Sequence, residues 1–307
     1  MVQEPVSLYE PVRYLMNLKG KRIRPVACLM AANVYTDDID KALPVACSIE
    51  MFHNFTLMHD DVMDDADLRR GNPTVHVKYD INTAILSGDL MMIKSYQHLI
   101  NCCSELEMKY KLLNLFTQTA IEVCEGQQYD MDFEERKNVS LNDYLLMIKL
   151  KTGVLLGGTF KAGALIGGAG DEDADHFYKL GLNIGLAFQI QDDLLDTYGT
   201  ENNFGKKIGG DIIQKKKTYL YLKTLELADD NGKKILTDLY NDDSIAPGIK
   251  VKNVKKLFDK YDVKTHAESL IDELTENAYD HLNALSVEKH KMDEIKKLLD
   301  ILLRRNN

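Results

Sequence analysis

The apolar residues of this chain recur at helical spacing over long stretches. Leu112, Leu115, Phe116 and Val123 follow the three-and-four-residue spacing of one helix face. No proline occurs between residues 74 and 246, which permits long helices because an interior proline costs roughly 3 kcal/mol. Alternating β-branched runs joined by Asn-Gly turns are nearly absent. The pattern predicts an all-α protein of about ten helices.

Gly, Pro, Asn and Asp predict where those helices break. The predicted breaks lie at residues 70–73, 167–171, 198–210 and 241–248. No stretch has the composition of an interdomain linker, and no repeat or low-complexity tract occurs. We therefore expect residues 1–307 to form a single domain.

Composition and charge narrow the class of protein. The 307 residues are 45% apolar and 28% charged, as in ordinary globular proteins, and the formal net charge is -10. That charge argues against a nucleic-acid partner but leaves room for a small anion in a locally basic pocket. The five cysteines lack the spacing of a zinc site or a disulfide scaffold. With no signal peptide or membrane-spanning run, we expect a soluble cytoplasmic protein.

The first acidic motif lies at the end of an apolar helical run, residues 49–55. It contains Asp60, Asp61 and Asp64 in an Asp-Asp-x-x-Asp pattern. At about 100° per residue, Asp60 and Asp64 lie about 40° apart on one helix face, and Asp61 lies about 60° from Asp64. Carboxylates so close repel one another, and the repulsion grows with burial unless a cation compensates.

The second acidic motif repeats this spacing at the end of another apolar helical run. Its aspartates are Asp192, Asp193 and Asp196. Hard oxygen ligands without Cys or His at matching positions favour Mg²⁺, with Mn²⁺ as the second choice, over zinc. A solvated acidic helix face is the alternative, but two such copies, each followed by basic residues, make metal binding the better interpretation. An EF-hand is excluded because its alternating ligand positions are missing.

Basic residues beside the acidic motifs predict the binding of a phosphorylated ligand. Six carboxylates and a diphosphate need several divalent ions and cationic side chains to be held together. The candidates are Lys21, Arg22, Arg24, Arg69, Arg70, Lys151, Lys206, Lys207 and Lys215–Lys217. Singly, each is more often a solvated charge, but their positions next to the motifs strengthen the joint interpretation.

These segments together resemble the trans-isoprenyl diphosphate synthases, the polyprenyl synthetase family. The matching motifs run in family order through residues 20–25, 50–53, 60–64, 69–71, 126–130, 151–153, 188–196 and 205–206. The resemblance covers nearly the whole chain. It implies long helices around a deep central cavity, usually in a homodimer. It also implies a magnesium-dependent prenyltransferase that condenses isopentenyl diphosphate with an allylic diphosphate and releases diphosphate.

The resemblance also implies roles for individual residues. For Mg²⁺ the most direct ligands are Asp60, Asp64 and Asp192, supported by Asp61, Asp193 and Asp196. The allylic diphosphate is expected at Arg69, Lys151, Thr152, Gln189, Lys206 and Lys216. Isopentenyl diphosphate is expected at Lys21, Arg24, His53 and Arg70. Without the resemblance, His53 would be read as an ordinary core histidine. The released diphosphate, not a side chain, is expected to take the final proton.

Two departures from the family pattern are visible. The family usually has Gly-Gly before the first lysine, and here the pair is Lys19-Gly20. The chain also begins close to that motif, so we expect the first helix, which commonly contributes to the dimer, to be truncated. Neither departure affects the expected ligand residues.

The resemblance further gives Phe55 and Thr56 a role in setting product length. Phe55 lies five residues before Asp60, a little over one helical turn. Spacing alone does not aim it at the cavity, since five residues turn the helix by about 140°. One aromatic residue here favours a 20-carbon over a 15-carbon product. A plain core aromatic is the alternative for Phe55.

Two other functions remain open from the sequence. A class I terpene cyclase shares the helical fold, but its second motif is typically of the Asn-Ser-Glu type. A non-catalytic subunit of a heteromeric prenyl synthase tends to lose motif aspartates, and this chain keeps both sets.

Overall fold

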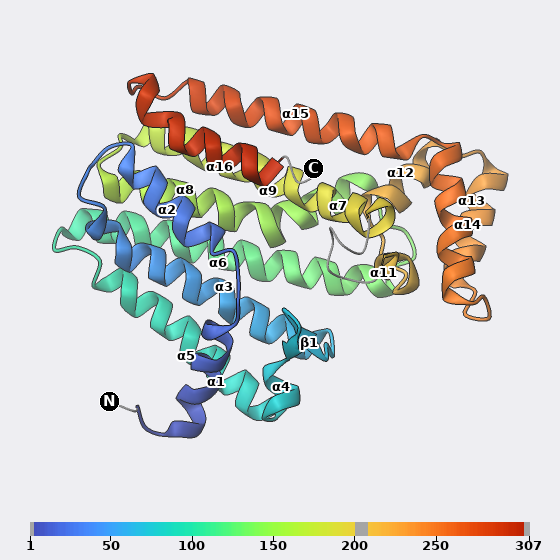
Figure 1. Ribbon diagram of the computed structural model, residues 1–307, viewed down its shortest axis with the longest axis horizontal. Coiled ribbons are helices and arrows are strands. Elements are labelled where there is room, and N and C mark those ends of the chain that lie inside the picture. The colour runs from blue at the N-terminus through green and yellow to red at the C-terminus, as the bar shows by residue number, and fades with distance from the viewer. Residues whose placement is uncertain (1–2, 200–207, 304–307) are drawn as a thin grey trace. The chain divides into compact units, whose positions relative to one another are not determined.

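The computed structural model describes residues 3–199 and 208–303, and the chain divides into two compact units. The first comprises the described residues of Met1–Thr117, Thr159–Asp175 and Ser286–Ile295. The second comprises those of Gln118–Gly158, His176–Leu285 and Lys296–Asn307. The described chain is almost entirely helical (Figure 1), so the predicted all-α class is confirmed. The single domain stays a prediction.

The first unit contains the N-terminal helices. Its elements are α1 (Val6–Asn17), α2 (Ile23–Asn33), the short 3₁₀ helix η1 (Ile39–Ala42), α3 (Leu43–Met63), β1 (Leu68–Arg69), β2 (Asn72–Pro73), α4 (Val75–Lys78), α5 (Ile81–Ile100) and the 3₁₀ helix η3 (Lys289–Met292). Helices α3 and α5 pack side by side along most of their lengths (Figure 1). The two-residue strands form an antiparallel hairpin directly after the first acidic motif.

The second unit contains α7 (Leu141–Ile148), the π-helical turn η2 (Lys149–Gly153), α11 (Gly210–Ile213), α12 (Tyr219–Leu227), α13 (Asp230–Asn241), α14 (Pro247–Lys260) and α15 (Val263–Asn283). Four helices contribute residues to both units: α6 (Leu106–Glu135), α8 (Val154–Gly167), α9 (Asp171–Tyr198) and α16 (Asp293–Leu303). The core of the second unit includes Ile148, Ile190, Leu220 and Phe258. Leu194, inside the second acidic motif, and Tyr144 belong to the same core.

The predicted breaks agree with the observed helix ends. The first predicted break, residues 70–73, falls in the hairpin, and the second, residues 167–171, falls in the turn between α8 and α9. The fourth, residues 241–248, falls in the connection from α13 to α14. At the third, α9 ends at Tyr198 and α11 begins at Gly210, with residues 200–207 outside the description. These breaks were readable because glycine and proline act locally on the backbone.

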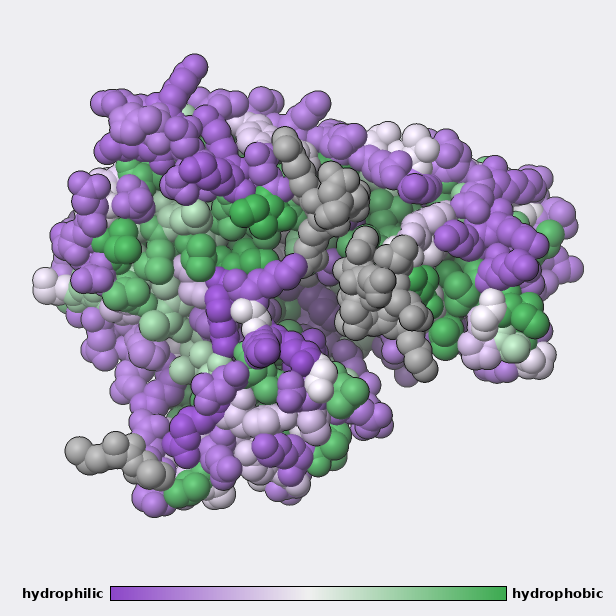
Figure 2. All heavy atoms as spheres, in the orientation of Figure 1, coloured by the Kyte–Doolittle hydropathy of each residue, from purple (hydrophilic) through white to green (hydrophobic). Residues whose placement is uncertain are grey.

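Surface composition follows the high content of charged residues. In the face shown in Figure 2, hydrophilic side chains dominate, and hydrophobic ones gather in smaller areas, one of them over α4 and the hairpin. Leu68 and Val77 are exposed there. Across the described residues, no helix combines the length and apolar character needed to cross a bilayer.

Candidate active site

The first acidic motif occupies the last turn of α3, and its three carboxylates have different surroundings. Asp61 is buried, at 1% exposure, Asp60 is half-buried and Asp64 is exposed. Asp64 directly follows the helix, and its backbone N–H donates to the carbonyl of Asp60 over 2.8 Å. The helix therefore ends inside the motif, which leaves the outer carboxylates near the surface while Asp61 faces the interior of the first unit.

Arg69 in strand β1 pairs with the buried carboxylate of Asp61. Its Nε donates to Oδ1 at 3.0 Å and to Oδ2 at 3.2 Å, and its Nη2 also donates to Oδ1. Burial raises the pKa of Asp61, and the Arg69 guanidinium opposes that rise. The pair links the hairpin to α3. The sequence had placed both residues at the ligand but gave no sign that they bind each other.

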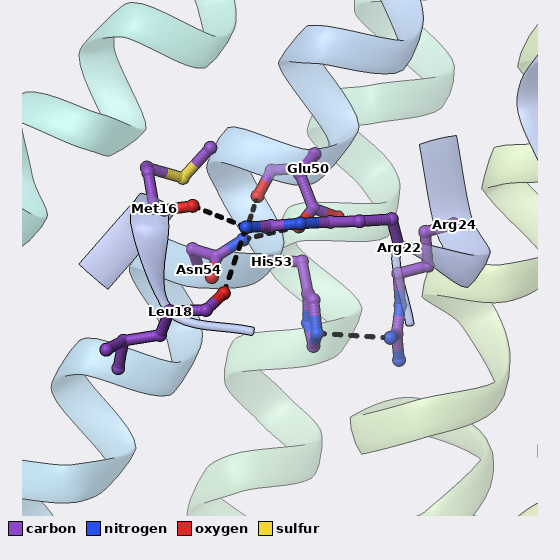
Figure 3. Close-up of polar contacts among 7 residues, drawn as sticks. All are labelled: Met16, Leu18, Arg22, Arg24, Glu50, His53 and Asn54. Carbon is purple, nitrogen blue, oxygen red and sulfur yellow. Dashed lines mark hydrogen bonds and ion pairs between the residues drawn. The ribbon is translucent and has the colours of Figure 1, made fainter. Parts of the chain in front are cut away.

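Arg24 of α2, His53 of α3 and Arg70 after β1 form a half-buried basic cluster in the first unit. Arg24 Nη1 lies 3.2 Å from Nε2 of His53 (Figure 3). Burial, together with the charges of Arg24 and Arg70, holds the pKa of His53 well below its usual range. The imidazole is therefore neutral at physiological pH, and we assign its Nε2 as the acceptor because a guanidinium only donates.

Two donors of this cluster are buried without a hydrogen-bond partner in the described part of the chain. They are Nε of Arg24 and Nη1 of Arg70. Burial also lowers the pKa of Arg24 to about 10. Unpaired buried donors on charged groups are costly, and an anion with several oxygens would satisfy them. Such an arrangement is typical of a preformed phosphate site.

Gly20 explains why only one glycine of the expected pair is needed. A Cβ added to Gly20 would lie 2.8 Å from Nη1 of Arg70, so the guanidinium packs against the bare backbone. Lys19, in place of the first family glycine, is exposed, as is Lys21. The departure noted in the sequence therefore falls on a solvent-facing position, and the glycine in contact with the basic cluster is retained.

Arg22 lies in the same motif but has a different role. Its guanidinium donates to the Glu50 carboxylate and to the carbonyls of Met16 and Leu18, the last at 3.2 Å (Figure 3). Glu50 is 7% exposed and also accepts from Asn54 at 2.9 Å. Arg22 thus ties the end of α1 to α3, and its charge is matched by Glu50. Its left-handed backbone, with φ of 50°, has no signal in the sequence.

The second acidic motif, near the end of α9 in the second unit, has two buried carboxylates and one half-buried carboxylate, that of Asp192. Asp193 accepts from the hydroxyl of Tyr144 and from the backbone N–H of Tyr219, the latter at 3.1 Å. Burial and the charge of Asp211 raise the pKa of Asp193 to about 7, against the opposing hydrogen bonds. Asp193 is therefore already engaged by protein groups.

Lys151 lies in the π-helical turn η2, where Gly126 of α6 lets two backbones approach closely. A Cβ on Gly126 would lie 2.2 Å from the backbone nitrogen of Lys151. The Lys151 ammonium donates to the carboxylate of Asp130, a residue that the sequence placed in a family motif but gave no role. A π-turn is rare and often marks a functional site.

Thr152 and Gln189 connect this turn to the second acidic motif. The Thr152 hydroxyl donates to Oε1 of Gln189 at 3.3 Å, and Nε2 of Gln189 donates to Asp193 at 3.5 Å. Lys216 lies exposed between α11 and α12. Lys206 and Lys207, expected after the motif, lie outside the described residues.

The acidic side chains suit a hard divalent cation by their chemistry. Carboxylate oxygens are the ligands that Mg²⁺ prefers, and it completes its shell with water and substrate phosphates rather than with a full protein cage. Within residues 3–199 and 208–303, no three His, Cys, Asp or Glu side chains are gathered as a ready-made metal site. A metal shared with substrate phosphates is compatible with that, since one or two carboxylates per ion then suffice.

Phe55 belongs to an aromatic cluster in the first unit. Its ring centroid lies 4.7 Å from that of His59 and 5.5 Å from that of Phe52, which in turn lies 5.1 Å from Phe116. Phe55 is 8% exposed. The Thr56 hydroxyl donates to the carbonyl of His53 at 2.9 Å. Both the product-length role and the plain core role of Phe55 are compatible with these contacts.

Comparison with known proteins identifies the family. The model of the family described as polyprenyl synthetase matches residues 5–259. The chain is 38% identical to geranylgeranyl diphosphate synthase of Sulfolobus acidocaldarius over 91% of its own length and 85% of that protein. It is 42% identical to geranylgeranyl diphosphate synthase of Methanosarcina mazei over 73% of its own length and 69% of that protein.

Solved structures agree with this assignment. The geranylgeranyl pyrophosphate synthetase from Pyrococcus horikoshii Ot3 superposes with a TM-score of 0.93 at 33% identity, covering 100% of this chain and 92% of that one. The chain therefore belongs to the polyprenyl synthetase family of prenyltransferases.

Proposed function

We propose that this prenyltransferase condenses isopentenyl diphosphate with an allylic diphosphate in the presence of Mg²⁺ and forms mainly a 20-carbon trans-prenyl diphosphate. The observation that carries the proposal is the basic cluster of Arg24, His53 and Arg70, with its two buried unpaired donors. A diphosphate supplies the anionic oxygens that would satisfy them. The names of the relatives given above support the 20-carbon product.

In this proposal Arg24, Arg70 and Lys21 bind the diphosphate of isopentenyl diphosphate, and neutral His53 holds the Arg24 guanidinium in place. Of these three cations, Arg24 and Arg70 are half-buried and Lys21 is exposed. Positive charge held in a partly desolvated place binds an anion more strongly than the same charge in water. Fixing the diphosphate also fixes the attached double bond, which must approach the allylic carbon closely to react.

We further propose that Asp60, Asp64 and Asp192 bind Mg²⁺, while Arg69, Lys151 and Lys216 bind the allylic diphosphate. Bound Mg²⁺ would draw negative charge onto the departing diphosphate and so lower the barrier to ionisation. The protein cations stabilise the same developing charge. No general base is assigned among the side chains, and the released diphosphate is proposed to accept the proton lost from the condensed product.

The homodimer is also part of the proposal. Leu86, Ile93 and Ile100 are exposed on α5 and recur every seven residues, so they lie within about 40° of one another on the helix. Exposed apolar stripes of this kind are typical of interfaces. We propose that a second copy of the chain covers this stripe.

One incubation separates the proposed activity from its alternatives. The purified chain is mixed with isopentenyl diphosphate, a 10- or 15-carbon allylic diphosphate and Mg²⁺, and the products are identified by mass. A diphosphate longer by five-carbon units is the expected result. Hydrocarbon formed from the allylic substrate alone would indicate a terpene cyclase instead. Absence of turnover would indicate a non-catalytic subunit.

A further inference from the structure

Two aspartates of the second acidic motif fasten one segment of the chain, residues 209–219. Near its start, Gly209 donates its backbone N–H to the carbonyl of Asp196 at 2.7 Å, and Asp211 donates its own to the Asp196 carboxylate at 3.1 Å. At its end, Tyr219 donates its backbone N–H to Asp193 at 3.1 Å. All of these residues belong to the second unit. The motif therefore grips this segment near both ends.

Lys217 links the same segment to the end of α6. Its ammonium donates to the carbonyl of Phe133 and, at 2.7 Å, to that of Arg136. Phe133 lies in the last turn of α6 and Arg136 directly follows the helix, where the last helix carbonyls lack intrahelical partners and carry partial negative charge. Lys217 therefore caps the C-terminus of α6. Its side chain is half-buried and does not extend into solvent.

The three consecutive lysines 215–217 have different surroundings as a result. Lys215 has a left-handed backbone, with φ of 58°, and pairs with Asp243 at 2.7 Å. The Lys217 ammonium is bonded to the carbonyls at the end of α6. Lys216 is exposed, and its backbone N–H is bonded to the carbonyl of Asp211 at 2.9 Å. In the described structure its ammonium makes no hydrogen bond or ion pair, so it is the one of the three left available for a ligand.

We propose that Lys217 is a positioning residue which, together with Asp193 and Asp196, holds residues 209–219 so that Lys216 is presented to the allylic diphosphate. This inference rests on the proposed function, in which Lys216 binds that diphosphate. In it, Asp193 and Asp196, the second and third aspartates of the second motif, anchor residues 209–219.

The proposal predicts a selective change in substrate binding. Lys217→Met keeps an unbranched apolar stem of similar reach but removes the ammonium that bonds both carbonyls. Loss of a charge-assisted contact on a ligand typically weakens binding tenfold or more, so we expect the KM for the allylic diphosphate to rise by roughly 10-fold. The KM for isopentenyl diphosphate should stay unchanged. Lys217→Arg, which can still donate to two carbonyls, should restore most of the loss.

The decisive measurement is a double-mutant cycle on the KM for the allylic diphosphate. Because Lys217 acts through Lys216, Lys216→Ala alone and the Lys216→Ala, Lys217→Met double variant should show the same KM. Lys264→Met is the matched control, since it removes the ammonium of an exposed surface pair with Glu268 outside residues 209–219, and it should change this KM by less than about twofold. If Lys217→Met does not fold, Lys217→Gln replaces it in the same cycle.

The outcomes separate this inference from the proposed function. A wild-type chain that fails to lengthen the allylic substrate would remove the proposed function itself. An active wild type in which Lys216→Ala raises the KM but Lys217→Met does not would overturn the positioning role alone. Additive effects of the two substitutions would overturn it as well, because independent residues add.

Discussion

At the residue scale, the buried carboxyl group of Asp193 makes the stability of the folded protein depend on pH. Its pKa is raised from 3.8 to about 7, chiefly by burial and by Asp211. Between these values the unfolded chain has the carboxyl ionised while the folded protein keeps it protonated. The folded state then binds more protons, so its stability decreases as pH rises from about 4 to about 7. This holds for the metal-free protein.

We therefore expect Asp193→Asn to remove part of this pH dependence. The amide oxygen can still accept from Tyr144 and Tyr219, and no charge is buried at high pH. In thermal unfolding with a chelator present, Tm of the variant relative to wild type should increase from pH 5 to pH 8. Asp243→Asn is the control, because the pKa of exposed Asp243 is lowered by Lys215 and does not change state in this range. A constant difference for Asp193→Asn would contradict the assignment.

Phe55 gives a second prediction at this scale. Phe55→Ala removes a buried ring beside His59 and Phe52, and the space should admit a longer prenyl chain, so products beyond 20 carbons are expected. The cavity would cost about 3–5 kcal/mol of folding stability, so the variant's folding is checked by circular dichroism. Phe55→Tyr keeps the ring and should leave the product unchanged. A product spectrum of Phe55→Ala identical to that of wild type, read by mass, would leave Phe55 a core residue only.

Local sequence patterns identified many of the candidate residues but not their partners. The aspartates and the basic residues near them stand out because their spacing is local and helical. The pairing of Arg69 with Asp61, and of Arg22 with Glu50, depends on how separate elements pack. The bond from Tyr144 to Asp193 joins residues far apart in sequence for the same reason. No single-sequence pattern contains that information.

At the element scale, His59 and Gly88 set how closely α3 approaches α5 beside the first acidic motif. A Cβ on Gly88 would lie 2.2 Å from Nε2 of His59, and this ring nitrogen also bonds the carbonyl of Ile85 at 3.0 Å. His59 directly precedes Asp60. Any Cβ at residue 88 would therefore force the His59 ring, and with it the start of the motif, to shift.

Gly88→Ala should disturb that contact in spite of alanine's better helix propensity. Overpacking costs about 1–3 kcal/mol, against about 1 kcal/mol gained from propensity, so a net loss of stability and of activity is expected. Gly248→Ala is the control in α14, because nothing lies within 4 Å of its added Cβ, and it should stabilise slightly. Urea unfolding measures the free energy of unfolding, and steady-state rates measure the activity. Unchanged activity of Gly88→Ala would show that the contact does not position the motif.

Helix ends were predicted better than helix irregularities. Gly and Pro residues predicted the turns at 167–171 and 241–248. The π-turn that holds Lys151 and the left-handed residues Arg22 and Lys215 had no such signal. Each of these is maintained by tertiary contacts that offset a locally unfavourable backbone, as the packing of Gly126 against Lys151 illustrates.

At the scale of the whole molecule, the exposed stripe of Leu86, Ile93 and Ile100 tests the proposed homodimer. A charge placed at Ile93, which is 62% exposed, would be buried at such an interface without a partner. Ile93→Glu should therefore convert the dimer to a monomer, measured by light scattering after size exclusion. Ile81→Glu, at a site that is 54% exposed but outside the stripe, should leave the mass unchanged. A wild-type chain that is already monomeric would refute the proposal.

The unpaired donors of Arg24 and Arg70 have a consequence for how the enzyme is regulated by its own by-product. In the proposed function these groups recognise a diphosphate rather than the hydrocarbon attached to it, so the inorganic diphosphate released in each cycle would itself be a ligand. We expect it to inhibit competitively against isopentenyl diphosphate and to raise Tm when bound. Turnover would then depend on the hydrolysis of inorganic diphosphate elsewhere in the cell. Adding a pyrophosphatase to the assay should lengthen the linear phase of product formation.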